Sequence, residues 1–265
     1  MTEKEYRQHP AISRSELWRI HESPQRFRYF KDHPEEPTPA LLFGQVFHKM
    51  ALEPSTFHEE YAVAPDVDRR TKEGKQRWGE FVEQSAGKSV IPAEMFEQAK
   101  AMCESLMAEP LAVKLLDGPR ETPFFWTDDK TGEACKCRTD CLNTNYSRPI
   151  VVDVKSATDA STENFTRDAI KYGYDFQSAM YSEGVSKNIG QMPLFVFIVV
   201  EKSPPYAVNI LQADELLMKR GAHLYRDSMD IYHDCKQSGN WYGYLGKKNQ
   251  INNLALPAWL AREVE

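Results

Sequence analysis

The 265-residue sequence is poor in cysteine, has no long hydrophobic run and carries no excess of positive charge. Its five cysteines are an odd number without a secretory segment ahead of them, which predicts a cytoplasmic protein in a reducing environment. The longest apolar run, Leu194 to Val200, is far too short to span a bilayer. A net charge of −6 argues against nucleic-acid binding through overall charge, so any DNA contact must come from local basic segments or bound metal.

The composition, with 41% hydrophobic and 27% charged residues, is that of an ordinary folded protein with a full core. We expect a single domain over residues 1–265. Within it, the patterns predict a mainly helical part over 1–110, a mixed core over 118–236 and a tail over 237–265.

The most informative stretch is Arg148 to Ser156, in which a β-branched run is interrupted by an acid and a base. This pattern predicts a mostly buried strand. Strand alternation places Asp153 and Lys155 on one face and the apolar residues at 150, 152 and 154 on the other. Because burying unpaired charges costs on the order of several kcal/mol, these two side chains need a partner, water or a metal.

A second strand is expected from Glu133 to Leu142. One of its faces would carry Lys136, Arg138 and Asp140, and the other Cys135, Cys137, Thr139 and Cys141. A short polar link makes this strand an antiparallel neighbour of the first, so that Asp140 could face Asp153. Two carboxylates near one lysine form the oxygen site that magnesium prefers, although an ion-pair cluster on a solvated sheet face would show the same pattern.

The segment Leu41 to Leu52 is apolar on nearly every face and predicts a buried helix. Gly44 and His48 lie one turn apart, so the glycine would leave room beside the imidazole for a close neighbour. His48 is either a hydrogen-bonded core histidine or a metal ligand.

The order of the remaining elements predicts a mixed α/β fold. Strands are expected at 122–127, 133–142, 148–156, 194–201 and 206–211, and helices at 92–107, 161–188 with a break near Gly173, and 214–235. Together with an earlier helix, they form an α-β-β-β-α-β core. Gln177 and Tyr181 share a face of the crossover helix, at the end of the sheet that carries Asp153.

Two basic segments could contact phosphates. Residues 65–77 predict a flexible cationic loop, and Arg26 and Arg28 alternate with aromatic residues on a short helix. The alternatives are a solvated loop and an amphipathic helix whose arginines extend along its apolar side.

These motifs, in this order, resemble the RecB-type nucleases of the PD-(D/E)XK superfamily. More closely, they look like the C-terminal nuclease domain of the phage exonuclease VIII (RecE) family, from about residue 11 to the tail. The resemblance rests on Ile12-Ser13-Arg14-Ser15-Glu16-Leu17 with Glu22-Ser23-Pro24, Phe43-Gly44 with Phe47-His48, Arg69-Arg70-Thr71, Cys135 to Asp140, Asp153-Val154-Lys155, and Gln177-x-x-x-Tyr181-Ser182.

The resemblance implies a restriction-endonuclease-like core with helical additions at both ends. It also implies a magnesium-dependent exodeoxyribonuclease, in which manganese would substitute. The enzyme would digest linear double-stranded DNA from 5′ ends and generate single strands for annealing-type recombination. Carried over, the metal ligands would be His48, Asp140, Asp153 and the carbonyl of Val154. Lys155 would orient or activate the attacking water, and Gln177 and Tyr181 would brace the site or touch the DNA backbone.

Further expectations concern the acid, the DNA contacts and the assembly. Glu121 would be a possible additional acid, and Thr139 stands where the superfamily name has proline. Candidate DNA-binding residues are Arg14, Arg26, Arg28, Arg69, Arg70, Lys72 and Lys75. Because an acidic protomer binds DNA poorly in the open, we expect a homo-oligomer that gathers these segments. The resemblance points to a tetrameric ring and to a single-strand annealing protein as a partner.

Three alternatives remain at this stage. The first is an iron–sulfur variant of this nuclease group, although the spacing of Cys135, Cys137 and Cys141 differs from that of its cluster ligands. The second is a non-catalytic DNA-binding module. The third is a metal-dependent hydrolase of another phosphodiester.

Overall fold

The computed structural model describes residues 1 and 3–256. Its helices are α1 (Glu3–Gln8), α2 (Arg14–Glu22), α3 (Pro24–Asp32), α4 (Pro39–Leu52), the 3₁₀ helix η1 (Pro54–Thr56), α5 (Phe57–Glu60), α6 (Lys72–Gln84), α7 (Ala93–Ala108), α8 (Pro110–Leu115), α9 (Thr162–Lys171), α10 (Tyr174–Ile189) and α11 (Glu215–Ser238). Its strands are β1 (Ile12–Ser13), β2 (Tyr61–Val63), β3 (Ser89–Ile91), β4 (Arg120–Thr127), β5 (Ala134–Asn143), β6 (Ile150–Ala157), β7 (Leu194–Glu201) and β8 (Val208–Gln212). Among these helices, none combines the length and apolarity that crossing a membrane requires.

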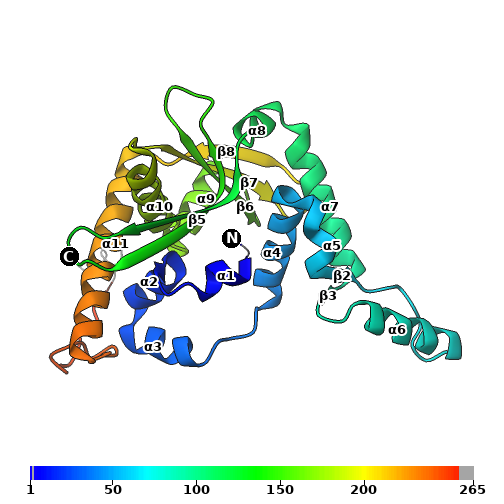
Figure 1. The fold of residues 1–265 in the computed structure, drawn as a ribbon, viewed down its shortest axis with the longest axis horizontal. Coiled ribbons are helices and arrows are strands. Elements are labelled where there is room, and N and C mark those ends of the chain that lie inside the picture. The colour runs from blue at the N-terminus through cyan, green and yellow to red at the C-terminus, as the bar shows by residue number, and fades with distance from the viewer. Residues whose placement is uncertain (2, 257–265) are drawn as a thin grey trace.

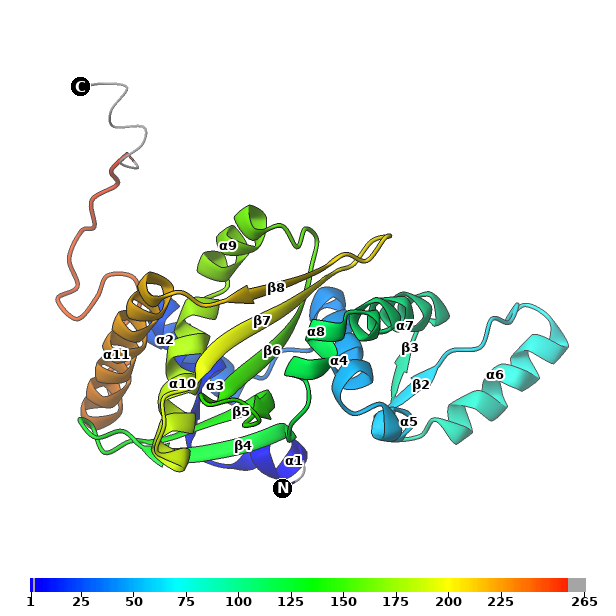
Figure 2. The ribbon, with the colours of Figure 1, turned by 90° about the horizontal axis from the view of Figure 1, so that it is seen from above.

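A six-stranded sheet forms the centre of the molecule (Figures 1 and 2). Its strand order is β1-β5-β6-β7-β8, and β4 pairs with β5. β6 is antiparallel to β5 and parallel to β7. A parallel pair needs a crossover, which α9 and α10 supply. The predicted mixed α/β fold with its α-β-β-β-α-β order is therefore confirmed.

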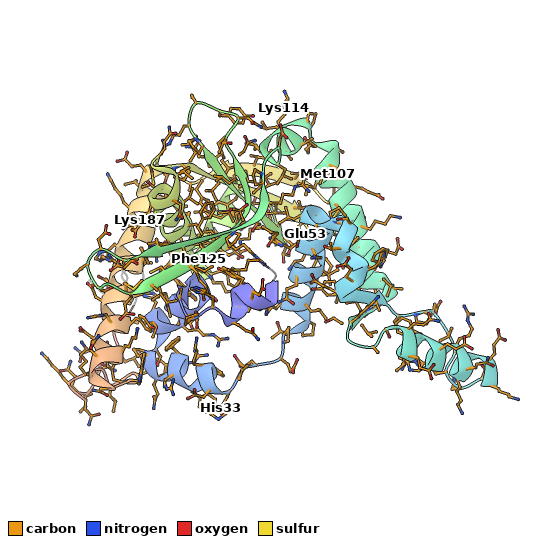
Figure 3. All side chains as sticks on the ribbon, in the orientation of Figure 1. His33, Glu53, Met107, Lys114, Phe125 and Lys187 are labelled. Carbon is orange, nitrogen blue, oxygen red and sulfur yellow. The ribbon has the colours of Figure 1, made fainter. Side chains whose placement is uncertain are left out.

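The two faces of the sheet are covered by different helices, and side chains fill both layers (Figure 3). On β6, Val151 packs in a core with side chains of α10 and α11, whereas Val152 and Val154 pack in a second core with α4 and α7. This alternation is the one that the sequence predicts for the strand. Asp153 and Lys155 therefore point from the face that α10 covers.

On β5 the predicted alternation is wrong at Cys141. Cys135 and Cys137 pack in the α10 core, but Cys141 packs in the α4 core. The regular pairing of β4 with β5 is interrupted opposite Asp140, where Glu121 adopts φ of 49°. The change of face therefore takes place between Cys137 and Cys141.

The hairpin of β4 and β5 is tied to α11 by a buried carboxylate. Asp128 accepts hydrogen bonds from the backbone N–H and hydroxyl of Thr131, at 2.8 and 2.6 Å, and pairs with Arg226 at 2.6 Å. Burial raises the pKa of Asp128, but these donors outweigh burial and hold that pKa below its ordinary value. The turn therefore depends on an ionised Asp128.

The predicted break in the crossover helix is confirmed at Gly173, which has φ of 65° and separates α9 from α10. A Cβ at this position would lie 2.3 Å from the indole of Trp18, so both the backbone angle and the space require glycine. The break sets the direction in which α10 begins. It thereby places Tyr174 and Gln177 beside β6.

The expectation of a flexible loop over 65–77 is wrong for its second half, because α6 begins at Lys72. Thr71 caps this helix by accepting a hydrogen bond from the N–H of Gly74 at 2.9 Å. The helix projects from the body on an arm that includes the two-stranded sheet of β2 and β3 (Figures 1 and 2). Of the expected tail over 237–265, residues 257–265 lie outside the described residues.

Candidate active site

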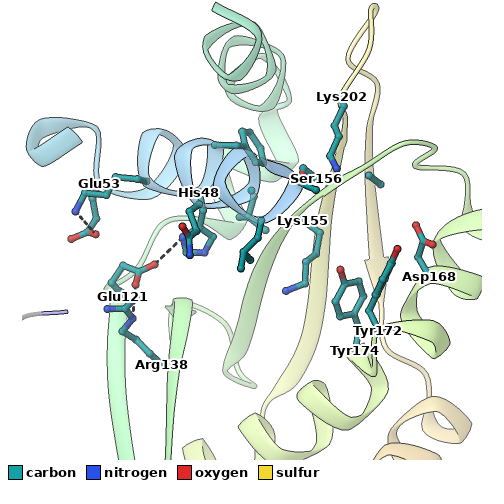
Figure 4. A pocket seen from close by; sticks show the side chains of 18 of the residues that line it. His48, Glu53, Glu121, Arg138, Lys155, Ser156, Asp168, Tyr172, Tyr174 and Lys202 are labelled. Carbon is teal, nitrogen blue, oxygen red and sulfur yellow. Dashed lines mark hydrogen bonds and ion pairs between the residues drawn. The ribbon is translucent and has the colours of Figure 1, made fainter. Parts of the chain in front are cut away.

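A pocket of about 550 Å³ lies where α4, the first part of β4, β6 and the α9–α10 junction meet (Figure 4). Its walls carry both signs of charge, with the carboxylates of Glu53, Glu60, Glu121 and Asp168 and the cations of Arg7, Lys49, Arg138, Lys155 and Lys202. The pocket also exposes the rings of Tyr172 and Tyr174. The predicted site residues His48, Val154 and Lys155 are among the residues that line it.

Three side chains from three elements converge beside this pocket, of which His48 and Glu121 line it and Asp140 is buried. His48 of α4 lies between two carboxylates, with Nε2 2.8 Å from Asp140 Oδ2 and Nδ1 3.4 Å from Glu121 Oε1. One ligand atom from each of the three residues lies within 4.8 Å of the other two. Among the described residues, this is the one group of its kind with metal-ligand geometry.

Each of the three is held in place by its own element. The buried face of α4, which includes Val46, Phe47 and Ala51, fixes the helix against the sheet and leaves His48 at the pocket wall. The N–H of Val154 on β6 donates to Asp140 Oδ2 at 2.7 Å. Glu121 Oε2 pairs with Arg138 Nε at 2.7 Å, and its φ of 49° turns the side chain toward the imidazole.

The three residues perturb one another electrostatically. Burial alone would lower the pKa of His48, but Asp140 and Glu121 outweigh burial and raise that pKa to about 9. Burial raises the pKa of Asp140, yet His48 more than compensates and holds it below its ordinary value. Burial raises the pKa of Glu121 to about 7, against the effect of His48. Without a metal, the imidazolium of His48 is therefore the cation of this group.

Asp153 belongs to a neighbouring group rather than to these three. Its carboxylate contacts Lys155 Nζ at 2.6 Å and accepts a hydrogen bond from the side-chain amide of Gln177. Lys155 Nζ also donates to Gln177 Oε1 at 3.2 Å and lies 4.7 Å from the centre of the Tyr174 ring. Gln177 thus links the acid to the base.

This arrangement keeps Lys155 charged. Burial lowers the pKa of Lys155, but Asp153 outweighs burial and raises that pKa above its ordinary value. Burial raises the pKa of Asp153 to about 6, although Lys155 opposes the shift. Lys155 can therefore donate hydrogen bonds and stabilise negative charge at neutral pH, but it is poorly suited to remove a proton.

The donor set fits a hard divalent cation. Glu121 Oε1 and Asp153 Oδ2 are buried oxygens that lack a partner with hydrogen-bond geometry, even though His48 and Lys155 lie close to them. A cation would satisfy such oxygens. Two carboxylates and one imidazole in a largely oxygen-lined site suit Mg²⁺ or Mn²⁺ rather than a softer metal.

The remaining predicted site residues are placed as follows. Val154 lines the pocket and holds Asp140 through its N–H. Tyr181 packs in the α10 core near Phe195 and is absent from the described lining of the pocket. Gly44 lines the pocket, and a Cβ there would meet nothing within 4 Å, so the close neighbour expected beside it is not another described residue of the chain.

The predicted DNA-binding residues are spread over the surface. Arg14 donates to the backbone carbonyls of Tyr172 and Gly173, so it anchors the α9–α10 junction. The other candidates lie outside the described lining of this pocket and are exposed: Arg26 and Arg28 on α3, and Arg69, Arg70, Lys72 and Lys75 on the arm. Their contact with DNA stays a prediction.

Sequence reasoning left the role of Glu121 open and missed Tyr174 and Lys202. Tyr174 precedes Gln177 by three residues, so helical spacing could have placed it on the same face. The position of Glu121 depends on the distorted start of β4, which has no signature in the sequence. The cysteines of the iron–sulfur alternative lie in two different cores, as described above for Cys135, Cys137 and Cys141.

The fold is similar to that of a solved structure. A crystal structure of a provisionally assigned exonuclease from Eubacterium rectale superposes with a TM-score of 0.64, at 13% sequence identity, over 98% of this chain and 97% of that chain. A structure of the protein SSO0001 is 14% identical, covers 86% of this chain and 81% of that chain, and reaches a TM-score of 0.41. No curated protein matches the sequence.

A family model supplies the assignment. It covers residues 13–253, which include strands β4 to β8 and the residues of the candidate metal site, and its description is a PDDEXK-like domain of unknown function, DUF3799. Both the fold and this match support a nuclease of the PD-(D/E)XK type, as the sequence motifs suggest. The chain belongs to the family of PDDEXK-like domains, DUF3799.

Proposed function

We propose that this protein is a metal-dependent exodeoxyribonuclease that acts on linear double-stranded DNA. The observation that carries the proposal is the convergence of His48, Glu121 and Asp140 within 4.8 Å, beside a charged Lys155, in a PDDEXK-like domain. Metal-dependent hydrolysis of a phosphodiester needs ligands for the metal and a group that stabilises the developing negative charge, and this domain holds both side by side. A non-catalytic module would have no need to keep two buried carboxylates around one imidazole.

In the proposed reaction, His48, Glu121 and Asp140 would hold Mg²⁺, with Asp153 available as a further acidic ligand. When bound, the metal would polarise the scissile phosphate and lower the pKa of a water molecule. The chain's own contribution is orientation and charge. Lys155 would donate to the water or to the phosphate oxygens, while Gln177 holds Lys155 and Asp153 in register.

The pocket offers further groups for the substrate. Arg7, Arg138 and Lys202 lie on its wall and can neutralise phosphates on either side of the scissile bond. Tyr174, whose ring is 4.7 Å from Lys155 Nζ, can contact the sugar or base of the nucleotide that is being released. Digestion from 5′ ends, and the supply of single strands to an annealing protein, belong to this proposal through the resemblance to the exonuclease VIII family.

Digestion of linear duplex DNA labelled at its 5′ or 3′ end, with magnesium or with EDTA, tests the activity and its polarity. We expect the 5′ label to be released as mononucleotides in the reaction with magnesium and to stay on the DNA in the reaction with EDTA. Circular duplex and a non-nucleic phosphodiester serve as control substrates. Hydrolysis of the latter at the same rate would favour a general phosphodiesterase, and no cleavage of any DNA in magnesium or manganese would refute the nuclease.

We also propose that the active species is a homo-oligomer, of which a tetrameric ring is the form that the resemblance implies. A protomer with net charge −6 gains positive potential along the DNA when basic segments of several copies face one channel. Light scattering at the assay concentration, together with a challenge-DNA test of processivity, examines this. A monomeric mass with distributive digestion would contradict the ring and leave the metal site untouched.

A further inference from the structure

A second pocket, of about 460 Å³, lies between α1, α3 and α11, next to the candidate active site. Arg7 lines both pockets, so its side chain forms part of the wall between them. The position of α1 is fixed by the buried ammonium of Lys136, which donates to the carbonyls of Tyr6 and His9 at 2.8 and 2.7 Å. The shared wall is therefore a fixed feature of the fold.

The charged residues that line this second pocket are positive, although the chain as a whole has a net charge of −6. It includes the cationic side chains of Arg7, Arg28, Lys31 and Lys236, as well as His9, and it includes neither aspartate nor glutamate. Carboxylates do lie behind it: Arg28 pairs with Asp32 at 3.0 Å, Lys31 with Glu16, and Lys236 with Glu133. These pairs hold the cations at the rim while their acidic partners stay outside the pocket.

The floor of the second pocket is aromatic. Phe27 is buried and lies 5.3 Å from Trp241 and 6.0 Å from Tyr232, measured between ring centres. Trp241 and Tyr232 are only partly buried, and both residues line the pocket. The segment that carries Trp241 is tied to α3, because the N–H of Gln25 donates to the carbonyl of Tyr242 at 3.1 Å.

Cations around partly exposed aromatic rings match the chemistry of single-stranded nucleic acid, in which unpaired bases stack and phosphates need neutralisation. Paired bases of a duplex have no free face for such stacking, and a pocket of this volume is too small for a duplex. Arg7 borders both pockets, so a strand held in the second pocket would lie next to the candidate active site.

We propose that the second pocket binds a short stretch of single-stranded DNA next to the site of cleavage. In this assignment, which rests on the proposed nuclease function, a base stacks on Trp241 or Tyr232 and its flanking phosphates contact Arg7, Arg28 and Lys236. The enzyme would thereby hold an unpaired strand at the junction with the duplex that it digests.

The test is the binding of a labelled oligothymidylate to the metal-free protein in EDTA, followed by fluorescence anisotropy. Arg28→Glu should weaken binding about tenfold. Arg167→Glu is the control, because Arg167 is an exposed arginine that also pairs with a carboxylate four residues away, but it lies on α9 outside the described lining of both pockets. The control should change affinity by less than about twofold, since the change in net charge is the same.

A second pair of variants tests stacking. Trp241→Leu should weaken binding about fivefold or more, because loss of a stacked ring costs about 1–3 kcal/mol per base, whereas Trp241→Phe should retain most of the affinity. Equal weakening by Arg28→Glu and Arg167→Glu would overturn the assignment, as would equal affinity of Trp241→Leu and Trp241→Phe. Displacement of the oligonucleotide by dTMP at equal nucleotide concentration would assign a free-nucleotide site instead. Because metal is absent, none of these outcomes depends on nuclease activity.

Discussion

Lys155→Met removes the ammonium at the centre of the candidate active site while keeping most of the side-chain volume. In the native protein Lys155 Nζ is 2.6 Å from Asp153 Oδ2, and Asp153 is only 2% exposed. Without the lysine, we expect Asp153 to take up a proton at pH 7 rather than stay buried as an unpaired anion. The pKa of Asp153 is already raised to about 6 in the native protein. Protonation of Asp153 at pH 7 therefore lowers the free energy of unfolding by at most about 1.4 kcal/mol, which corresponds to the one unit between that pKa and pH 7.

The metal-free variant should therefore melt only a few degrees below the native protein, by about 2–4 °C for a chain of this size. Single-turnover cleavage should fall by about 10²–10³-fold, because Lys155 stabilises the charge of the transition state. The assay is single-turnover digestion across a range of magnesium concentrations, with the exposed Lys171→Met on α9 as control. Rescue to the native rate at high magnesium would mean that Lys155 only balances charge, and would refute the reasoning.

Three further predictions follow from the same contacts. Asp140→Ala or Asp153→Ala should remove most cleavage and leave DNA binding in calcium largely intact; near-normal cleavage by both variants would falsify the site assignment. His48→Ala should weaken magnesium-dependent activity by a large factor without a matching drop in melting temperature, and an unfolded variant would instead identify a structural histidine. Asp128→Asn should cost about 2 kcal/mol at pH 7. Because the folded pKa of Asp128 is lowered, its contribution is present above the ordinary value of about 4 and is lost as pH falls further, so melting curves of the native protein and Asp128→Asn should converge below pH 4.

The central part of the fold could be predicted because its signals are local. The β-branched run around Asp153 and the polar link before it specify strand β6 and its antiparallel neighbour, and the glycine at 173 specifies the break between α9 and α10. These features depend on side-chain alternation and backbone angles, which a sequence displays directly.

The remaining features depend on tertiary contacts. Glu121 approaches His48 from a position in β4 where the backbone has a positive φ, and Cys141 packs in the second core against the predicted alternation of β5. Arg14 is one of the predicted DNA contacts, and the sequence does not show that its guanidinium donates to backbone carbonyls at the α9–α10 junction. Helix α6 was not predicted, because its basic residues and few apolar residues are typical of a loop. Its start depends on the cap that Thr71 provides.

Binding of Mn²⁺ in the absence of DNA, followed by the electron paramagnetic resonance of the free ion, tests most directly whether His48, Glu121 and Asp140 form a metal centre. Asp140→Asn should weaken Mn²⁺ binding by at least about tenfold, since a charged ligand becomes neutral. Asp168→Asn is the control, because Asp168 is a carboxylate that lines the same pocket as His48 and Glu121 but lies outside the group of three (Figure 4). The account predicts native affinity for Asp168→Asn and weak binding for Asp140→Asn; equal affinity of the two variants would contradict it.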